Sequence, residues 1–201
     1  MLDLCVKRFK RVVGFYMYHV PDLSFEEDVI VWAEKRYGIE ITRIPHWDIS
    51  RMLRNGVLRR NLADVPVMRI NETDDLMRDK FGIEYIASGE TKGESIQRRG
   101  MLSALGPSTV REGVWDHKRR RYFPIADWNR ATVFNYLKRN HIPIPAYYSK
   151  MRTSFGRMQA EELQSIHDQY PEDYEKILVI FPFAEAIRQR VQLYETATVR
   201  S

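Results

Sequence analysis

The chain of 201 residues contains 44% hydrophobic, 29% charged and 12% aromatic residues, values typical of a globular protein that exclude wholesale disorder. Its longest apolar run, residues 177–183, is too short to cross a bilayer, so no membrane partner is expected. The single cysteine, Cys5, excludes an internal disulfide and a cysteine-ligated iron–sulfur cluster, and the five histidines lack metal-ligand spacing. We therefore predict no metal site.

The charge balance is basic. A net charge of +5 and a pI near 9.3 indicate attraction to polyanions, either nucleotide phosphates or nucleic acid. Basic residues cluster at 51–60 and at 118–121, and a plain solvated basic surface is the alternative to a nucleic-acid face. No signal peptide is recognisable at the N-terminus, so the cytoplasm is the expected location.

The first part of the chain has the pattern of a βαβ unit. Residues 1–9 show a helical apolar face that begins without a cap, and residues 12–18 form a nearly continuous apolar strand. A capping box of Ser24 and Glu27 opens a helix that ends at Gly38, and residues 39–45 form a second strand. This order predicts an open parallel sheet.

The rest of the chain alternates in the same way. We expect helices over 74–81, 94–105 and 127–140, the last capped by Asp127, and strands over 83–87 and 119–124. A loop over 145–158 and two helices over 159–170 and 172–194 follow, the second interrupted by Pro182. The predicted class is α/β, a Rossmann-like, open, mostly parallel sheet with helices on both faces and a C-terminal helical extension. The predicted domains are residues 1–150, which bind nucleotide, and the extension over 151–201.

The first candidate site spans residues 89–98, where a predicted strand leads into a helix. In open parallel sheets, ligands bind at the carboxyl ends of strands, where helix N-termini present amides to anions. Glycine there lets a phosphate approach the backbone closely. The alternative is a simple strand-to-helix turn capped by Ser95, and the stretch is not a Walker A loop. The candidate residues are Gly89, Lys92, Gly93, Glu94, Ser95 and Arg98.

The second candidate junction begins at Pro124 and continues through Asp127 and Trp128 into a helix with Val133 and Tyr136 on one face. Prolines at 143 and 145 end that helix and lead to Tyr148. The combined order of the two junctions resembles the phosphoadenosine phosphosulfate reductase family, within the adenine nucleotide alpha hydrolases, or ATP pyrophosphatases. The resemblance extends from Val12 to about Tyr148.

This resemblance implies a Rossmann-like sheet that carries an adenine nucleotide, ATP or phosphoadenosine phosphosulfate, across its strand ends. By the resemblance, Glu94, Ser95 and Arg98 line the nucleotide site. Lys92 and the three arginines Arg119, Arg120 and Arg121 are expected to meet the anionic part of the ligand. Pro124, Asp127 and Trp128 are expected to support the site.

Two features depart from the family pattern. The phosphate loop Ser-Gly-Gly-x-Asp-Ser is not found, and residues 1–9 correspond to the end of the helix that this loop would open. We therefore expect a member without its first strand and phosphate loop, through a late start codon, a split gene or degeneration. The reductases' catalytic cysteine near the C-terminus has no counterpart, and Cys5 is expected to be a core residue.

Three functional hypotheses follow. The leading one is a sulfonucleotide-reductase-like protein that binds or acts on an adenine nucleotide. A sulfur-transfer or nucleic-acid-modifying protein of the same superfamily would account for the basic charge without a reductase cysteine. The third is a non-catalytic binding or assembly module, whose basic surface or C-terminal helices hold a nucleic acid, a protein or a second copy of the chain.

Overall fold

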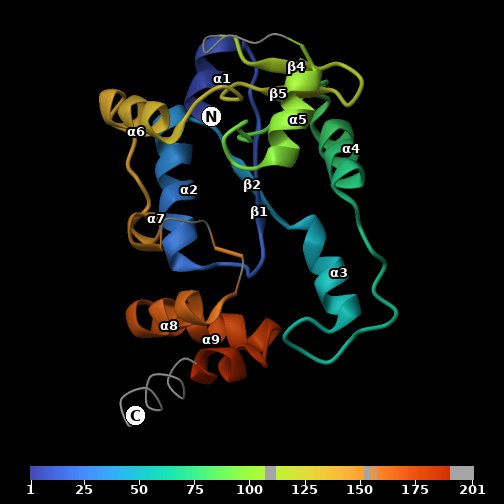
Figure 1. Ribbon diagram of the computed structural model, residues 1–201, viewed down its shortest axis with the longest axis vertical. Coiled ribbons are helices and arrows are strands. Elements are labelled where there is room, and N and C mark those ends of the chain that lie inside the picture. The colour runs from blue at the N-terminus through green and yellow to red at the C-terminus, as the bar shows by residue number, and fades with distance from the viewer. Residues whose placement is uncertain (107–111, 152–154, 157, 191–201) are drawn as a thin grey trace. The chain divides into compact units, whose positions relative to one another are not determined.

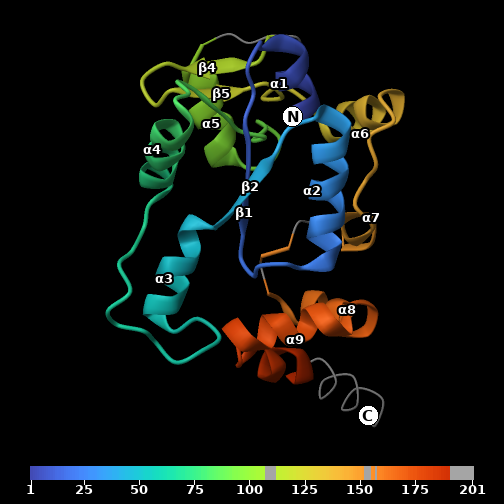
Figure 2. The same cartoon turned by 180° about the vertical axis from the view of Figure 1, so that it is seen from behind.

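The computed structural model describes residues 1–106, 112–151, 155, 156 and 158–190. It combines helices with small, mostly parallel sheets, which confirms the predicted α/β class and is consistent with a Rossmann-like fold (Figures 1 and 2). The described residues contain no helix that is both long and apolar enough to span a membrane. The chain divides into two compact units, each built from segments distant in sequence. The predicted division near residue 150 stays a prediction.

The first unit contains residues Met1–Gly14, Tyr37–Glu40 and Asn71–Pro143. Its sheet has the order β3-β5-β4, in which β3 pairs parallel to β5 and β4 pairs antiparallel to β5. Helix α5 lies beside these strands in both views, and Leu102 of α5 packs on Phe123 of β5 (Figures 1 and 2). Its elements are α1 (Leu2–Arg8), α4 (Ile70–Phe81, whose first residue belongs to the second unit), β3 (Ile86–Ala87), α5 (Ile96–Ala104), β4 (Val114–Asp116), β5 (Arg121–Phe123) and α6 (Arg130–Arg139).

A buried carboxylate joins α1 to α6 in this unit. Asp3 is 4% exposed and forms an ion pair of 2.7 Å with Lys7, one turn later in α1. Its other oxygen accepts a hydrogen bond from the Tyr37 hydroxyl at 3.1 Å, and the Tyr136 hydroxyl of α6 also donates to Asp3. Burial alone would raise the pKa of Asp3, but these partners outweigh it and hold the pKa below its usual value. The N-terminal helix is therefore part of the folded unit.

The second unit contains residues Phe15–Arg36 and Ile41–Ile70 and the described residues from Ile144 onward. Strands β1 and β2 form a two-stranded sheet, and α8 and α9 lie side by side in both views (Figures 1 and 2). Its elements are β1 (Gly14–Tyr18, whose first residue belongs to the first unit), α2 (Ser24–Tyr37, whose last residue does too), β2 (Ile41–Pro45), α3 (Trp47–Asn55), α7 (Ala146–Met151), α8 (Ala160–Gln169) and α9 (Pro171–Ile180). A further helical stretch covers residues 184–190.

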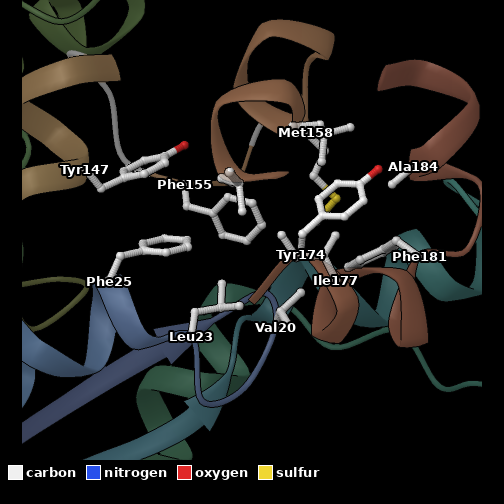
Figure 3. Packing of buried hydrophobic residues seen from close by; sticks show 12 residues of the cluster. Val20, Leu23, Phe25, Tyr147, Phe155, Met158, Tyr174, Ile177, Phe181 and Ala184 are labelled. Carbon is white, nitrogen blue, oxygen red and sulfur yellow. The ribbon is translucent and has the colours of Figure 1, made fainter. Parts of the chain in front are cut away.

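The core of the second unit is aromatic. Phe25 stacks on Tyr147 with ring centroids 4.6 Å apart, and Phe155 meets Phe25 edge-on at 5.9 Å (Figure 3). Tyr174 and Phe181 are also buried in this cluster (Figure 3). Residues from α2, α7 and α9 thus share one core, which places the predicted C-terminal extension among earlier segments of the chain.

Two predictions for the second half of the chain differ from the structure, whereas the predicted start of α2 is correct. The segment 145–158, predicted as a loop, contains α7. Helix α9 ends at Ile180, two residues before Pro182, and the predicted positions beyond residue 190 lie outside the described residues. Helix α2 begins at Ser24 as predicted, but Asp173 of α9 accepts the hydrogen bonds of Ser24.

Candidate functional site

The two junctions predicted from the sequence meet at one end of the first unit's sheet. Because β3 and β5 are parallel, with Ile86 opposite Arg121, their carboxyl ends lie at the same edge. The amide of Ser88 donates to the carbonyl of Tyr122 at 2.8 Å, and beyond the strands the amide of Lys92 donates to the carbonyl of Ala126 at 2.8 Å. The loop 88–95 is therefore held against the segment 124–128.

The loop is organised by its own side chains. The carboxylate of Glu94 accepts hydrogen bonds from the amide and hydroxyl of Thr91, at 3.2 and 3.4 Å. The hydroxyl of Ser95 accepts from the amide of Arg98 at 3.1 Å, so Ser95 is the N-cap of α5. The helix begins at Ile96, two residues after its predicted start, and the Ser95 cap is the one that the alternative reading of this stretch expected. These hydrogen bonds show that Glu94 and Ser95 shape the turn itself.

The cations of the loop are paired with carboxylates. The Nζ of Lys92 lies 2.6 Å from the Oδ1 of Asp127, and both side chains are largely shielded from solvent. The Nε of Arg98 lies 3.4 Å from Glu90, and its Nη1 donates to Glu94. An anionic ligand would therefore compete with these carboxylates for Lys92 and Arg98.

The two glycines of the loop have space around them. A Cβ added at Gly89 would lie 3.8 Å from the sulfur of Met1, and one at Gly93 would lie 3.8 Å from the hydroxyl of Thr91, both ordinary contact distances. Neither glycine has a positive φ. The fold thus tolerates a side chain at both positions, and packing does not require glycine at either of them.

Pro124, Asp127 and Trp128, the predicted supporting residues, follow β5 at this edge. Pro124 is buried, and Trp128 is 9% exposed, with its ring centroid 5.0 Å from that of Tyr136. The prediction that Asp127 caps the following helix was wrong, because Asp127 pairs with Lys92. The N-cap of α6 is Asn129, whose Oδ1 accepts from the amide of Thr132 at 2.8 Å.

The structure does not bring the three arginines of residues 119–121 to this edge. They precede or begin β5, whereas the loop follows β3 and meets the segment after β5. Each arginine is paired with a carboxylate within the unit. Arg121 donates to Asp74 at 2.8 Å, Arg120 to Asp75 at 3.1 Å and Arg119 to Asp116 at 3.3 Å. Their predicted contact with the anionic part of a ligand stays a prediction.

Sequence reasoning missed a pair of histidines in the second unit. His19 follows β1 directly and His46 follows β2, and their rings stack with centroids 4.4 Å apart. Burial, together with the neighbouring His46, lowers the pKa of His19 to about 4, and burial also lowers the pKa of His46. Their position directly after two predicted strands was the available signal, since adjacent parallel strands bring such residues together.

Cys5 is placed as predicted, in the interior. Its side chain is 5% exposed, and burial raises the pKa of its thiol. Because the thiolate is the reactive form of cysteine, this environment suits a structural thiol.

Comparison with known proteins points to the same family as the two junctions. A family model for the phosphoadenosine phosphosulfate reductase domain matches residues 1–163, a stretch that includes both junctions and most of the chain. No curated protein and no solved structure matches the chain.

Proposed function

The chain belongs to the phosphoadenosine phosphosulfate reductase family, and we propose that it binds an adenine nucleotide where the loop 88–95 meets the segment 124–128. One observation carries this proposal. The hydrogen bond from the Lys92 amide to the Ala126 carbonyl joins the two junctions at the carboxyl ends of parallel strands. Ligands of open α/β sheets bind at that edge. ATP and phosphoadenosine phosphosulfate are the proposed ligands.

The local geometry supports a ligand at this position. The loop leads into the N-terminus of α5, where the first amides of a helix point outward. Gly89 and Gly93 leave the backbone open to a close neighbour. Arg98 orders the loop through Glu90 and Glu94, so we expect it to preorganise the site.

Any chemistry on the nucleotide is proposed to proceed without Cys5 as a nucleophile. The Cys5 side chain is buried in α1, and its raised pKa keeps the thiol protonated near neutral pH. We therefore propose that the chain binds a nucleotide of the kind that sulfonucleotide reductases bind, and that the Cys5 thiol does not reduce sulfur.

Isothermal titration calorimetry with ATP and with phosphoadenosine phosphosulfate tests this function. We expect at least one of them to bind, and Arg98→Ala to weaken binding by about tenfold, equivalent to about 1.4 kcal/mol. The matched control is Arg139→Ala, which removes an exposed arginine from α6. Failure of both nucleotides to bind, or equal loss in the two variants, would refute the proposed site.

A basic segment favours a second candidate function, modification of nucleic acid. In the described part of the chain, Arg54 of α3 and the following Arg60 are exposed, and Arg51 is paired with Asp48 at 2.7 Å. Arginines on an exposed surface bind phosphates, and such binding weakens as salt rises. In a fluorescence anisotropy titration with labelled RNA, replacing Arg54 and Arg60 by alanine should lower the salt slope by about two. A slope unchanged by this double variant would reject the candidate.

A further inference from the structure

We propose that one face of the three-stranded sheet in the first unit binds single-stranded nucleic acid by stacking a base on an exposed aromatic ring. The exposed part of this face lies at the amino ends of β3 and β5, whereas the loop 88–95 follows β3 at its other end. The inference therefore goes beyond the nucleotide site, and it does not depend on Arg54 or Arg60. A cluster of aromatic rings and a group of exposed cations beside it carry the inference.

The two faces of this sheet differ in what they carry. On one face, Val114 and Phe123 share a buried cluster with Leu102 of α5. The alternate residues Trp115 and Tyr122 lie directly opposite each other on β4 and β5, so both project from the other face. Their rings stack with centroids 4.2 Å apart. Alternation along the two strands thus gives the sheet an aromatic face.

Part of the aromatic face is exposed. Phe9, directly after α1, meets Trp115 and Tyr122 edge-on at 6.1 and 5.7 Å, and Tyr122 is buried. Beside this buried part, the exposed ring of His117 is parallel to that of Trp115, with an interplanar angle of 6° and centroids 6.1 Å apart. The Tyr85 hydroxyl and the Nδ1 of His117 share a hydrogen bond of 2.9 Å. The His117 ring is therefore held in place while it remains accessible.

Exposed rings on a β-sheet are surfaces on which unpaired bases stack. Every base has a π-face, so such stacking tolerates different sequences, and loss of the ring weakens binding between about fivefold and about 150-fold. In a duplex, each base is already paired and stacked between its neighbours. The occupant that fits the accessible ring is therefore a single strand.

Two basic runs of the sequence meet beside these rings. Residues 7–11 contain four cations around Phe9, and residues 118–121 supply four more directly after His117. The packing of Phe9 on Trp115 brings the two runs to the same face of the sheet. Cations and aromatic rings together are the combination that single-stranded nucleic acid requires, because its backbone is anionic and its bases are flat.

Three of these cations are available to phosphates. Arg8, Lys10 and Lys118 are exposed, and none of them forms an ion pair with a carboxylate in the part of the chain that the structure describes. The guanidinium of Arg8 lies 5.6 Å from the ring centroid of Tyr122 and so stands directly beside the cluster. A phosphate can approach these cations without displacing a carboxylate, unlike at Lys92, which is paired with Asp127.

Fluorescence anisotropy with a labelled RNA of about ten nucleotides tests the inference on the full chain. The single strand should bind at least about fivefold more tightly than an abasic strand of the same length or the corresponding duplex. His117→Ala should weaken binding of the single strand by about tenfold and leave binding of the abasic strand unchanged. The matched control is His141→Asn, which replaces an exposed histidine at φ +51°, a conformation that asparagine tolerates, and it should bind as the unmodified chain does.

A second variant tests the cations. Replacing both Lys10 and Lys118 by alanine should lower the salt slope of RNA binding by about 1.4, because each phosphate contact on a single strand contributes about 0.7. An unchanged slope would overturn the assignment of these cations. Poly-glutamate that binds as tightly as the RNA would show a surface for acidic polymers in general and would also overturn the inference.

The remaining outcomes separate this inference from the proposed functions. Equal binding of the normal and abasic strands, or unchanged binding in His117→Ala, would overturn it. If RNA binding depends on Arg54 and Arg60 but not on His117, the inference fails and the second candidate function stands. Calorimetry with ATP should give the same result for His117→Ala and the unmodified chain, so a failure of the nucleotide site leaves this test intact.

Discussion

The carboxylate of Asp173 in α9 accepts two hydrogen bonds from Ser24 at the start of α2, one from the amide at 2.8 Å and one from the hydroxyl at 2.6 Å. Asp173 is 1% exposed, and Lys176 lies 2.9 Å from its other oxygen. Burial alone would raise the pKa of Asp173, but the hydrogen bonds from Ser24 and Lys176 outweigh it and lower the pKa. Residues 149 positions apart thus complete one helix terminus.

The variant Asp173→Ala tests how much this contact stabilises the fold. It removes the buried carboxylate that accepts from the amide and hydroxyl of Ser24, so we expect a loss of about 1–3 kcal/mol in the free energy of unfolding. Urea denaturation followed by circular dichroism measures it. The control Glu175→Ala removes an exposed carboxylate of the same helix and should change stability by less than about 0.5 kcal/mol. Similar losses in both variants would contradict the assigned contact.

Local sequence patterns predicted where helices and strands lie better than they predicted which distant residues the side chains contact. The start of α5 was predictable because Ser95 and Arg98 form a cap within four residues of chain. At Ser24 and Asp127 the local pattern was equally good, but Asp173 and Lys92 compete for these side chains through the tertiary structure. A side chain at a capping position can bond to a distant residue instead of to its own helix, and sequence spacing does not show which of the two it does.

Prediction of the candidate site from the sequence was limited in the same way. The sequence placed both junctions after strands, and the parallel pairing of β3 with β5 brings them together. It did not reveal that Arg121 would be bound to Asp74, because that partner lies in α4, 47 positions away. Basic residues close to a motif in sequence can therefore lie at the opposite end of the strand.

The second prediction concerns pH and Glu26 of α2. Burial, with repulsion from Glu27, Asp173 and Glu162, raises the pKa of Glu26 to about 7, although a hydrogen bond from Tyr16 opposes the change. Between its ordinary value and about 7, the folded state holds this proton more tightly than the unfolded state, so stability falls as pH rises through that window. Glu26→Gln should remove this dependence and stabilise the fold by about 1–3 kcal/mol at about pH 8.

Urea denaturation at a series of pH values checks this expectation. The control is Asp28→Asn, which changes an exposed carboxylate of the same helix and should leave the pH profile unaltered. If the Glu26→Gln variant retains the full decline in stability above about pH 5, the source of the decline lies elsewhere.

A third prediction contrasts two glycines of the first unit. Gly113 has φ +69°, and a Cβ there would lie 2.6 Å from the carbonyl oxygen of Phe123 and 2.8 Å from the Cα of Pro124. Gly113→Ala should therefore cost about 3 kcal/mol or more, because backbone atoms cannot move aside easily. Gly100 lies within α5 with open space around it, so Gly100→Ala should stabilise by about 0.5–1 kcal/mol. Thermal melts of the two variants should shift in opposite directions, and a shared direction would show that the backbone at Gly113, directly before β4, is misassigned.

The fourth prediction concerns the thiol of Cys5 and bears on the chemistry open to this protein. Its 5% exposure and raised pKa predict that a disulfide reagent such as dithionitrobenzoate reacts with the folded chain far more slowly than with free cysteine at the same pH. In concentrated urea the reaction should become fast and reach one thiol per chain. The Cys5→Ala variant gives the reagent blank, and it should bind nucleotide as the unmodified chain does. Two results would contradict a purely structural role for this thiol. One is rapid reaction of the folded protein, and the other is loss of nucleotide binding in a Cys5→Ala variant that melts normally.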